Sequence, residues 1–297
     1  GSHIKGLILN LIHSEWPELL EMNYVNCMVT PIIKATNGTK VKSFYTLTKY
    51  SQWKEKSMVG KWNIKYYKGL GTSTAKEAKE YFRNLKVNQY ITEGETTETM
   101  ELAFKKTEAD KRKEWLKQYK EEEILDYDCS ETRIDDFVNK ELIHFSNADN
   151  LRSIGSCIDG LKVSQRKILF SCFKRKLHNE IRVAQLSGYV SEQASYHHGE
   201  MSLQGAIVGM AQNFVGSNNI NLLQPNGQFG TRIMGGNDSA SARYIHTQLN
   251  PIVDTIFPQA DLPLLEYIND DGLMVEPKWY CPILPMVLVN GMVGIGT

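Results

Sequence analysis

The sequence predicts an α/β first part followed by a mainly helical part. Residues 24–35 are rich in strand-forming side chains, and Asn37-Gly38 then marks a tight turn before a second such run. From Ile134 onward, several stretches show helical spacing of apolar residues and then give way to a long segment rich in Gly, Asn and Gln. We therefore expect two domains, the second dominated by helices.

Composition limits the possible functions. The chain has 297 residues, of which 41% are hydrophobic and 23% charged, as in soluble globular proteins rather than disordered or membrane-spanning ones. Its 34 basic and 34 acidic side chains cancel, so a nucleic-acid partner can be inferred only from local clustering. The five scattered cysteines favour free thiols in an intracellular compartment and argue against a zinc site. The most apolar stretch, residues 282–296, is too short for a membrane helix, so no membrane partner is expected.

The first third alternates between helix and strand patterns. Residues 4–12 form an apolar run that suits a buried helix or strand, and residues 61–67 alternate in strand fashion. A helix is expected over residues 74–85, with Thr72 to Thr74 supplying its N-cap. Residues 100–123 are helical and densely charged, which is typical of a solvated helix face.

The second part is expected to be helical until about residue 215. Residues 217–249 then form a long irregular segment, in which five apolar side chains favour an ordered loop. These five are Leu222, Leu223, Phe229, Ile233 and Met234. Helices followed by a hairpin-like, Gly-rich extension fit a winged helix-turn-helix domain, a variant of a DNA-reading motif.

The strongest charge bias lies between Lys162 and Arg182, a stretch that contains seven basic residues and only one acidic residue, Glu180. On a helix, Arg166 and Lys167 would lie on a cationic face while Ile168 and Leu169 pack inward. Such a face suits the phosphate backbone of a polyanion. A solvated surface is the plainer alternative.

Two dipeptides are candidate chemical groups. His197-His198 is compatible with a metal, a hydrogen-bonded core pair or a phosphate contact, and adjacent histidines on a helix point in different directions, which disfavours a shared metal. Arg243-Tyr244 offers a tyrosine nucleophile beside a guanidinium that can stabilise a phenolate or phosphoryl oxygens. A buried tyrosine next to a surface arginine is the default interpretation of such a pair.

Three short glycine motifs, at residues 69–73, 235–238 and 294–297, resemble nucleotide-binding loops only superficially. None has the Walker spacing or the G-x-G-x-x-G spacing between strand and helix. They need no ligand as turns or helix entries, although the first precedes a helix whose amides suit a phosphate.

Taken together, the segments resemble the type IIA DNA topoisomerases, and specifically eukaryotic-type topoisomerase II, over nearly the whole chain. The most specific motifs are GSHIKGL (1–7), KYYKGLGTSTAKEAKEYF (65–82), DKRKEWL (110–116), NKELIHFSNADNLRSI (139–154), DGLKVSQRKILFSCFK (159–174), SYHHGEMSL (195–203), AQNFVGSNNINLLQPNGQFGTR (211–232), ARYIHTQL (242–249) and EPKWYCPILPMVLVNGMVGIGT (276–297). The match of Gly1-Ser2-His3 to the family favours native sequence there.

The resemblance implies a role for each matching residue. Tyr244 would attack a DNA phosphodiester with Arg243 beside it, and Ile295 would wedge between base pairs. The residues around the scissile phosphate would be Arg152, Lys162 and His198, and the segment from Lys65 through Lys68 to Thr72 would face DNA.

The resemblance also implies an architecture. Residues 1–90 would form the C-terminal part of a TOPRIM α/β region and residues 91–138 a charged helical linker. Residues 139–281 would form the winged-helix domain and residues 282–297 the start of a tower domain. Mg²⁺ would be held by acidic residues upstream of Gly1, so no metal ligand is assigned within this chain, and ATP would be used by a module absent from it.

The resemblance thus predicts the DNA-cleavage core of an ATP-dependent topoisomerase. It implies a homodimer on double-stranded DNA, in the nucleus or alternatively at a viral replication site in the cytoplasm or in an organelle. One alternative is a non-catalytic DNA-binding fragment, because the acidic metal cluster is not in the sequence. Another is an unrelated phosphotransferase, which would explain neither the basic stretch nor Arg243-Tyr244.

Overall fold

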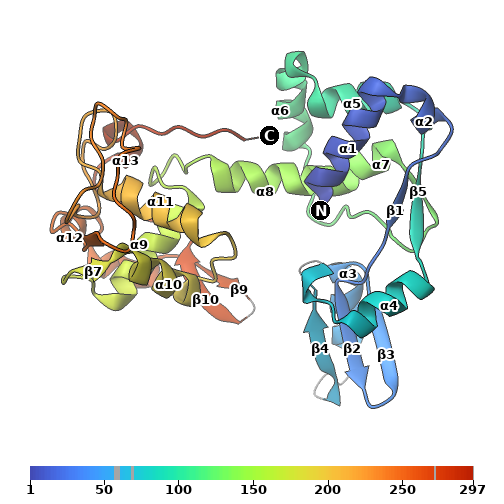
Figure 1. Ribbon diagram of the computed structural model, residues 1–297, viewed down its shortest axis with the longest axis horizontal. Helices are drawn as coiled ribbons and strands as arrows, with labels where there is room; N and C mark the ends of the chain where they lie inside the picture. The colour runs from blue at the N-terminus through green and yellow to red at the C-terminus, as the bar shows by residue number, and fades with distance from the viewer. Residues whose placement is uncertain (57–60, 68–69, 271, 297) are drawn as a thin grey trace. The chain divides into compact units, whose positions relative to one another are not determined.

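The computed structural model describes residues 1–56, 61–67, 70–270 and 272–296 (Figure 1). The chain divides into two compact units, Gly1–Asn147 and Ala148–Thr297. This division falls inside one helix, Ile143–Ser153. The boundary expected from the sequence was after residue 138.

The first unit mixes helices and short strands. Its helices are α1 (Ser2–Glu15), α2 (Pro17–Glu21), α3 (Leu47–Lys56), α4 (Ala75–Arg83), α5 (Thr96–Phe104), α6 (Ala109–Lys117), α7 (Ile134–Phe137) and the start of α8 (Ile143–Ser153). Single turns of other helix types lie at Leu70–Thr72 (η2), Lys106–Glu108 (η3) and Val138–Leu142 (η4). Its strands are β1 (Asn26–Met28), β2 (Ile33–Asn37), β3 (Lys40–Phe44), β4 (Asn63–Tyr66), β5 (Val87–Ile91) and β6 (Glu131–Arg133).

The predicted hairpin is confirmed. Strands β2 and β3 pair antiparallel, with Asn37 opposite Lys40 across the turn, and β4 joins the other edge of β2. Their apolar faces pack on α3 around the buried side chains of Ile33, Phe44 and Tyr50. A second sheet has the order β1-β5-β6, in which β5 and β6 run parallel.

Helix α4 begins where the sequence predicts. Thr74 is its N-cap and accepts a hydrogen bond from the Glu77 amide, while the Glu77 carboxylate accepts one from the Thr74 amide at 2.7 Å. This reciprocal capping box satisfies two amides that would otherwise lack partners at the helix start.

The charged stretch within residues 91–138 does not form the single helix that was expected there. The helix expected over residues 100–123 is broken into α5 and α6, and the Arg112 guanidinium donates to the carbonyls of Leu102 and Lys105 at the end of α5. Met100 on α5 and Trp115 on α6 are buried in the main core of this unit. These helices are therefore part of a folded domain, in which charges cover only the outer faces.

The apolar run at residues 4–12 forms a helix, but most of its side chains are not buried. In α1 only Gly6 and Leu9 are buried, whereas Ile4, Leu7, Ile8 and Leu11 are exposed. The expectation of a buried element thus holds for one face of α1 alone in the described part of the chain.

The second unit is mainly helical. Its helices are α9 (Val163–Arg175), α10 (Val183–Gln193), α11 (Glu200–Ala211), α12 (Val253–Ile256) and α13 (Met286–Val289), with a 3-10 segment η5 (Gln259–Leu264). Its strands are β7 (Ile181–Arg182), β8 (His246–Thr247), β9 (Tyr267–Asp270) and β10 (Leu273–Pro277), paired as β7-β8 and β9-β10.

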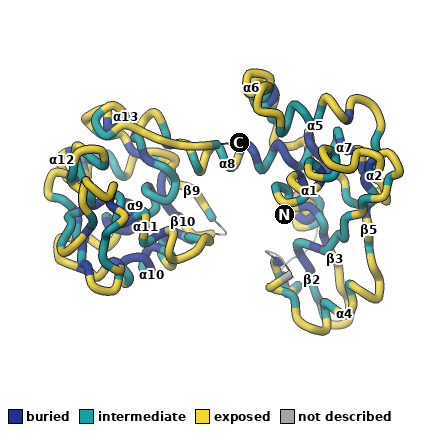
Figure 2. Tube along the Cα trace, turned by 45° about the horizontal axis from the view of Figure 1, so that its top comes forward, coloured by how far each residue is buried: buried dark blue, intermediate teal, exposed yellow. Residues whose placement is uncertain are grey.

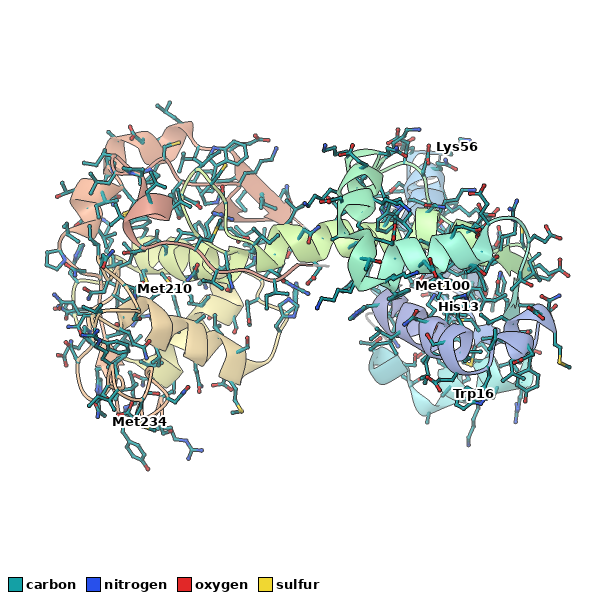
Figure 3. All side chains as sticks on the ribbon, turned by 90° about the horizontal axis from the view of Figure 1, so that it is seen from above. His13, Trp16, Lys56, Met100, Met210 and Met234 are labelled. Atoms are coloured by element: carbon teal, nitrogen blue, oxygen red, sulfur yellow. The ribbon has the colours of Figure 1, made fainter. Side chains whose placement is uncertain are left out.

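Helices α9, α10 and α11 supply most of the core of this unit, and Figure 2 shows buried positions alternating with more exposed ones along them. Fully buried side chains include Leu169 on α9, Leu186 on α10 and Ile207 on α11. Met210, labelled in Figure 3, belongs to the same core. The three helices match the predicted positions, and the winged-helix assignment itself stays a prediction.

The long Gly-, Asn- and Gln-rich segment contains only one short strand, yet much of it is well packed. Leu222, Leu223 and Phe229 are buried as expected, whereas Ile233 and Met234 are exposed. The Thr231 amide donates to Asp238 at 2.7 Å, and this hydrogen bond lowers the pKa of that carboxyl. Hydrogen bonding within the segment therefore adds to the stabilisation from its buried apolar side chains.

Two further observations concern the whole chain. All five cysteines are free. Among the described residues, no helix is both long and apolar enough to cross a membrane.

Candidate functional site

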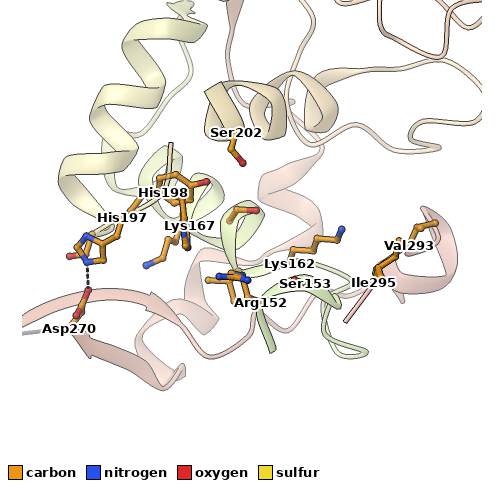
Figure 4. A pocket seen from close by; sticks show the side chains of 15 residues that line it. Arg152, Ser153, Lys162, Lys167, His197, His198, Ser202, Asp270, Val293 and Ile295 are labelled. Carbon is orange, nitrogen blue, oxygen red and sulfur yellow. Dashed lines mark ion pairs between the residues drawn. The ribbon is translucent and has the colours of Figure 1, made fainter. Parts of the chain in front are cut away.

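A cavity of about 770 Å³ lies within the second unit and gathers side chains from distant parts of the sequence (Figure 4). Its walls include Arg152, Lys162, Lys167, His198 and Ile295, all of which the sequence singled out. In Figure 4 Ile295 lies toward one side of the hollow, and the pair His197 and Asp270 lies toward the other. The structure thus brings half of the expected site residues to one place.

Arg152 reaches the cavity from the last turn of α8. Its guanidinium pairs with the Asp149 carboxylate, one turn earlier, and Ser153 donates to the same carboxylate at 3.0 Å. The side chain remains 46% exposed. Asp149 therefore fixes the orientation of Arg152, while part of the side chain stays open to solvent.

Lys162 stands at the N-cap of α9, after a tight turn that begins at Asp159. The Asp159 carboxylate is fully buried and accepts hydrogen bonds from the amides of Leu161 and Tyr280, both at 2.9 Å. Among the residues described, no carboxylate lies within ion-pair distance of the Lys162 ammonium. Lys162 is consequently the cation of this cavity whose charge is least neutralised by the protein.

The structure corrects the expectation that Arg166 lies on an open cationic face. Its side chain is 6% exposed, and its guanidinium donates to both oxygens of Asp159, at 2.8 and 3.0 Å, and to the Leu161 carbonyl. These partners occupy the planar fork that a phosphate would need. Arg166 is therefore a structural residue behind the Lys162 turn and is not available as a DNA contact.

Lys167 lines the cavity, but its ammonium is also engaged. It pairs with the buried Glu276 of β10 at 2.8 Å and donates to the carbonyl of Ala194 at 2.6 Å. Only 13% of the side chain is exposed. Arg166 and Lys167, both near the start of α9, therefore do not form the expected open cationic face.

His198 enters the cavity from the segment between α10 and α11. Its ring meets that of Tyr196 edge-to-face at 5.4 Å. The neighbouring His197 points instead toward Asp270 of β9, with 3.5 Å between Nε2 and Oδ2 (Figure 4). The two adjacent histidines therefore have different partners, which disfavours a shared metal ion.

Ile295 is presented by two glycines that pack closely against α8. A Cβ at Gly294 would lie 2.5 Å from the Ser153 carbonyl oxygen, and one at Gly296 would lie 2.0 Å from Oδ1 of Asn150. These contacts leave Ile295 87% exposed beside Arg152. Gly294 and Gly296 thus allow close packing on α8 and leave one apolar side chain exposed between them.

Tyr244 and Arg243 do not line this cavity. They lie on an exposed turn where the Tyr244 amide donates to the Ser241 carbonyl at 2.9 Å, and the Tyr244 side chain is 77% exposed. The default expectation of a buried tyrosine therefore fails, and the phenol is accessible to a large substrate.

The expected DNA-facing segment of the first unit is described only in part. Lys65 on β4 pairs with Glu77 at 2.8 Å and lies over the Tyr67 ring, and it remains 41% exposed. Burial alone would raise the pKa of Glu77, but hydrogen bonds from Lys65, Tyr67 and Thr74 outweigh it and lower the pKa to about 2. Lys68 and Gly69, the latter in the first glycine motif, lie outside the described residues.

No metal site is apparent in the described part of the chain, because no group of three or more His, Cys, Asp or Glu side chains converges there. The residues present therefore do not fit the Mg²⁺ that the resemblance implies. Asp270 lies in the cavity wall, where it faces His197.

Sequence patterns missed the acidic residues that organise the site. Asp159 holds Arg166, Glu276 holds Lys167 and Asp270 faces His197. The last two partnerships link residues 109 and 73 positions apart, so no local spacing could signal them. The Asp-Gly turn at residues 159–160 was the one local signal available.

Comparisons with known proteins agree over the whole chain. Residues 152–297 match the family model for the A subunit of DNA gyrase/topoisomerase IV, and residues 28–150 match the C-terminal associated domain of TOPRIM. The chain is 57% identical to DNA topoisomerase 2 of Arabidopsis thaliana and 54% identical to the mitochondrial DNA topoisomerase 2 of Dictyostelium discoideum. Each match covers all of this chain but only 21% and 24% of the relative, so the chain spans less than a quarter of their length.

A solved structure gives the same answer for the fold. The DNA-binding, cleavage and re-ligation domain of Plasmodium falciparum topoisomerase II superimposes with a TM-score of 0.83 at 48% identity, over 100% of this chain and 41% of that one. The likeness in sequence and fold confirms the resemblance found from the motifs, and the chain belongs to the eukaryotic-type topoisomerase II family.

Proposed function

We propose that this chain is the DNA-cleavage core of an ATP-dependent type IIA topoisomerase acting on double-stranded DNA. The observation that carries the proposal is the cavity of the second unit, where Arg152, Lys162 and His198 converge from three separate segments. A chain without net charge has no general attraction for DNA, so this local gathering of cations is the feature that suits a phosphate.

In the proposed reaction the Tyr244 oxygen attacks a phosphorus atom of the DNA backbone. A bond forms between that oxygen and phosphorus as the phenol gives up its proton, the bond from phosphorus to the 3′ oxygen breaks, and the 3′ oxygen takes up one proton and leaves as a hydroxyl. The product is a 5′-phosphotyrosine link, and the reverse attack reseals the strand. Because one phosphodiester replaces another, little free energy is lost. The 77% exposure of Tyr244 supports this role, since a duplex cannot enter a closed pocket.

The cations would act on the charge that develops at phosphorus. Arg152 and Lys162 border the cavity, and Arg243 neighbours the nucleophile in sequence. Oriented donors stabilise the equatorial oxygens of a phosphoryl transition state more than those of the ground state. His198 would donate a hydrogen bond to a phosphate oxygen from the same cavity.

Ile295 would act on the bases rather than on the phosphate. Its side chain is exposed beside Arg152, and the close packing of Gly294 and Gly296 on α8 supports it against displacement. Wedging an apolar side chain between base pairs costs a few kcal/mol of unstacking per step, which wider contact with the bent duplex offsets.

The remaining parts of the proposal concern the natural protein that contains this chain. Mg²⁺ would be bound by residues upstream of Gly1, and ATP would act in another module. A homodimer would cut both strands, one with each Tyr244, and the tyrosine of one protomer would work with the metal site of the other. The proposed location is the nucleus, with an organelle or a viral replication site as alternatives.

The test uses that natural protein with end-labelled duplex DNA and Mg²⁺, stopped abruptly with denaturant. We expect label on the protein that is lost in Tyr244→Phe, while the DNA affinity changes less than a few-fold. Tyr24→Phe is a matched control, because Tyr24 is also exposed, at 69%, but lies in the other unit. Tight binding without any adduct would support the non-catalytic alternative, and an adduct that survives in Tyr244→Phe would place the nucleophile elsewhere.

A further inference from the structure

The segment from Ala194 to Gly199, which carries His198 into the cavity, contains a strained backbone conformation. Ser195 has a φ of +47°, a left-handed value that side chains other than glycine rarely adopt. Helix α11, which follows the segment, has no side-chain cap at Gly199. Such a strained conformation persists only where surrounding contacts impose it.

The strongest of these contacts comes from Lys167. Its ammonium donates to the carbonyl of Ala194, directly before the strained residue, at 2.6 Å. The same ammonium pairs at 2.8 Å with Glu276, whose side chain is 3% exposed. A buried carboxylate without its partner is costly, so the Lys167 ammonium is held between Glu276 and the Ala194 carbonyl.

The hairpin β9-β10 also contacts the other end of the segment. Asp270 on β9 faces His197, next to His198, with 3.5 Å between Oδ2 and Nε2. Glu276 lies on β10 of the same hairpin. Side chains of these two paired strands thus contact the segment, through Lys167 before Ser195 and directly after Tyr196.

We propose that Lys167 and Glu276 are positioning residues for His198, and that Lys167 acts through the Ala194 carbonyl rather than by contacting DNA. This inference rests on the proposed function, because His198 matters only if the cavity receives a phosphodiester. The Lys167–Glu276 pair fixes the strained turn and thereby the place of the His198 ring. A displacement of about 1 Å at a reacting group is enough to slow a reaction by about 100-fold.

The experiment measures the single-turnover rate of adduct formation and the DNA dissociation constant in the natural protein. Lys167→Met should slow adduct formation by about 10- to 100-fold, as loss of groups that orient a functional residue does, with the dissociation constant changed by less than about three-fold. In a His198→Ala background the same substitution should have little further effect, because both changes remove one function. Lys278→Met is the matched control, since it removes an equal charge near the same hairpin from an exposed pair with Glu266.

A second variant keeps the test decisive if Lys167→Met misfolds. Lys167→Met leaves Glu276 buried and unpaired, whereas Lys167→Met combined with Glu276→Met removes both charges and is better tolerated. The double variant should unfold near the temperature of the unmodified protein and still form the adduct slowly.

The outcomes separate the two proposals. If Lys167→Met weakens DNA binding as much as it slows the reaction, and the loss multiplies with that of His198→Ala, Lys167 is a direct phosphate contact and the positioning role is rejected. A double variant that is folded and reacts at the normal rate rejects it equally. If the unmodified protein forms no Tyr244-dependent adduct, the proposed function fails instead.

Discussion

Arg166 and Asp159 form a two-bonded ion pair inside the second unit, with nitrogen–oxygen distances of 2.8 and 3.0 Å. Asp159 is fully buried and also accepts the amides of Leu161 and Tyr280. One carboxylate therefore joins α9, the turn that leads to Lys162, and the segment after β10. The pair connects these three parts of the unit. Because the pair is buried, loss of one partner should lower the free energy of unfolding strongly.

Arg166→Met should destabilise the second unit strongly. Removing one partner of a buried ion pair leaves an uncompensated charge and costs about 3–5 kcal/mol in the free energy of unfolding. Amide hydrogen exchange along α9, which reports local unfolding, would measure the loss. Lys278→Met should cost no more than about 1 kcal/mol, because its pair with Glu266 is exposed. Equal protection in the two variants would contradict the role given to Arg166.

Gly160→Ala should destabilise the same turn by steric means. Gly160 has a φ of +70°, and a Cβ there would lie 2.8 Å from the backbone nitrogen of Val287. Left-handed backbone and overpacking together cost about 2–4 kcal/mol. The melting temperature should fall, and Lys162 should lose its fixed place. Gly188→Ala is the control, because Gly188 lies in α10 with open space around it and should become more stable by about 0.5–1 kcal/mol.

Local signals in the sequence predicted the local structure. The Asn37-Gly38 turn and the Thr74 cap each depend on residues within a few positions, and both formed as expected. The break between α5 and α6 was missed, because helical periodicity does not reveal the hydrogen bonds from Arg112 to the carbonyls of Leu102 and Lys105. The parallel pairing of β5 with β6 joins residues about forty positions apart, which no turn motif specifies.

For the site, the sequence supplied candidate residues but not their surroundings. Motif resemblance named Arg152, Lys162, His198 and Ile295, and these do share one cavity. Charge counting treated Arg166 and Lys167 as open cations, since their carboxylate partners lie elsewhere in the sequence. A basic residue on a helix can face either a phosphate or a buried acid, and periodicity alone does not distinguish the two.

The stability of the β2-β4 sheet should depend on pH through Glu77. Its pKa in the folded protein is about 2, below the value of about 4.3 in an unfolded chain. A lowered pKa stabilises the fold above the unfolded value, and this contribution is lost as the pH falls through the folded value. Glu77→Gln should therefore cost about 1–3 kcal/mol at pH 6 and little at pH 2.

Urea unfolding followed by tryptophan fluorescence would measure this difference, because Trp53 and Trp62 pack against the core of that sheet. Glu80→Gln is the control on the same helix, since Glu80 is 57% exposed and pairs with Lys34 alone among the ion pairs described. If the free energies of unfolding of Glu77→Gln and the unmodified protein differed by the same amount from pH 6 to pH 2, the lowered pKa of Glu77 would be rejected as the cause.

Ile295→Ala should reduce the bend of bound DNA without unfolding the protein. The side chain is 87% exposed, so its removal costs little stability, whereas a shortened wedge unstacks the bases less. Energy transfer between dyes at the two ends of a short duplex would report a larger end-to-end distance. Leu288→Ala is the matched control, because Leu288 is 79% exposed on α13 and does not line the cavity. Gly294→Ala should act in the same direction as Ile295→Ala, since a Cβ 2.5 Å from the Ser153 carbonyl forces the segment away from α8. A bend unchanged by either substitution would show that Ile295 does not enter the base stack.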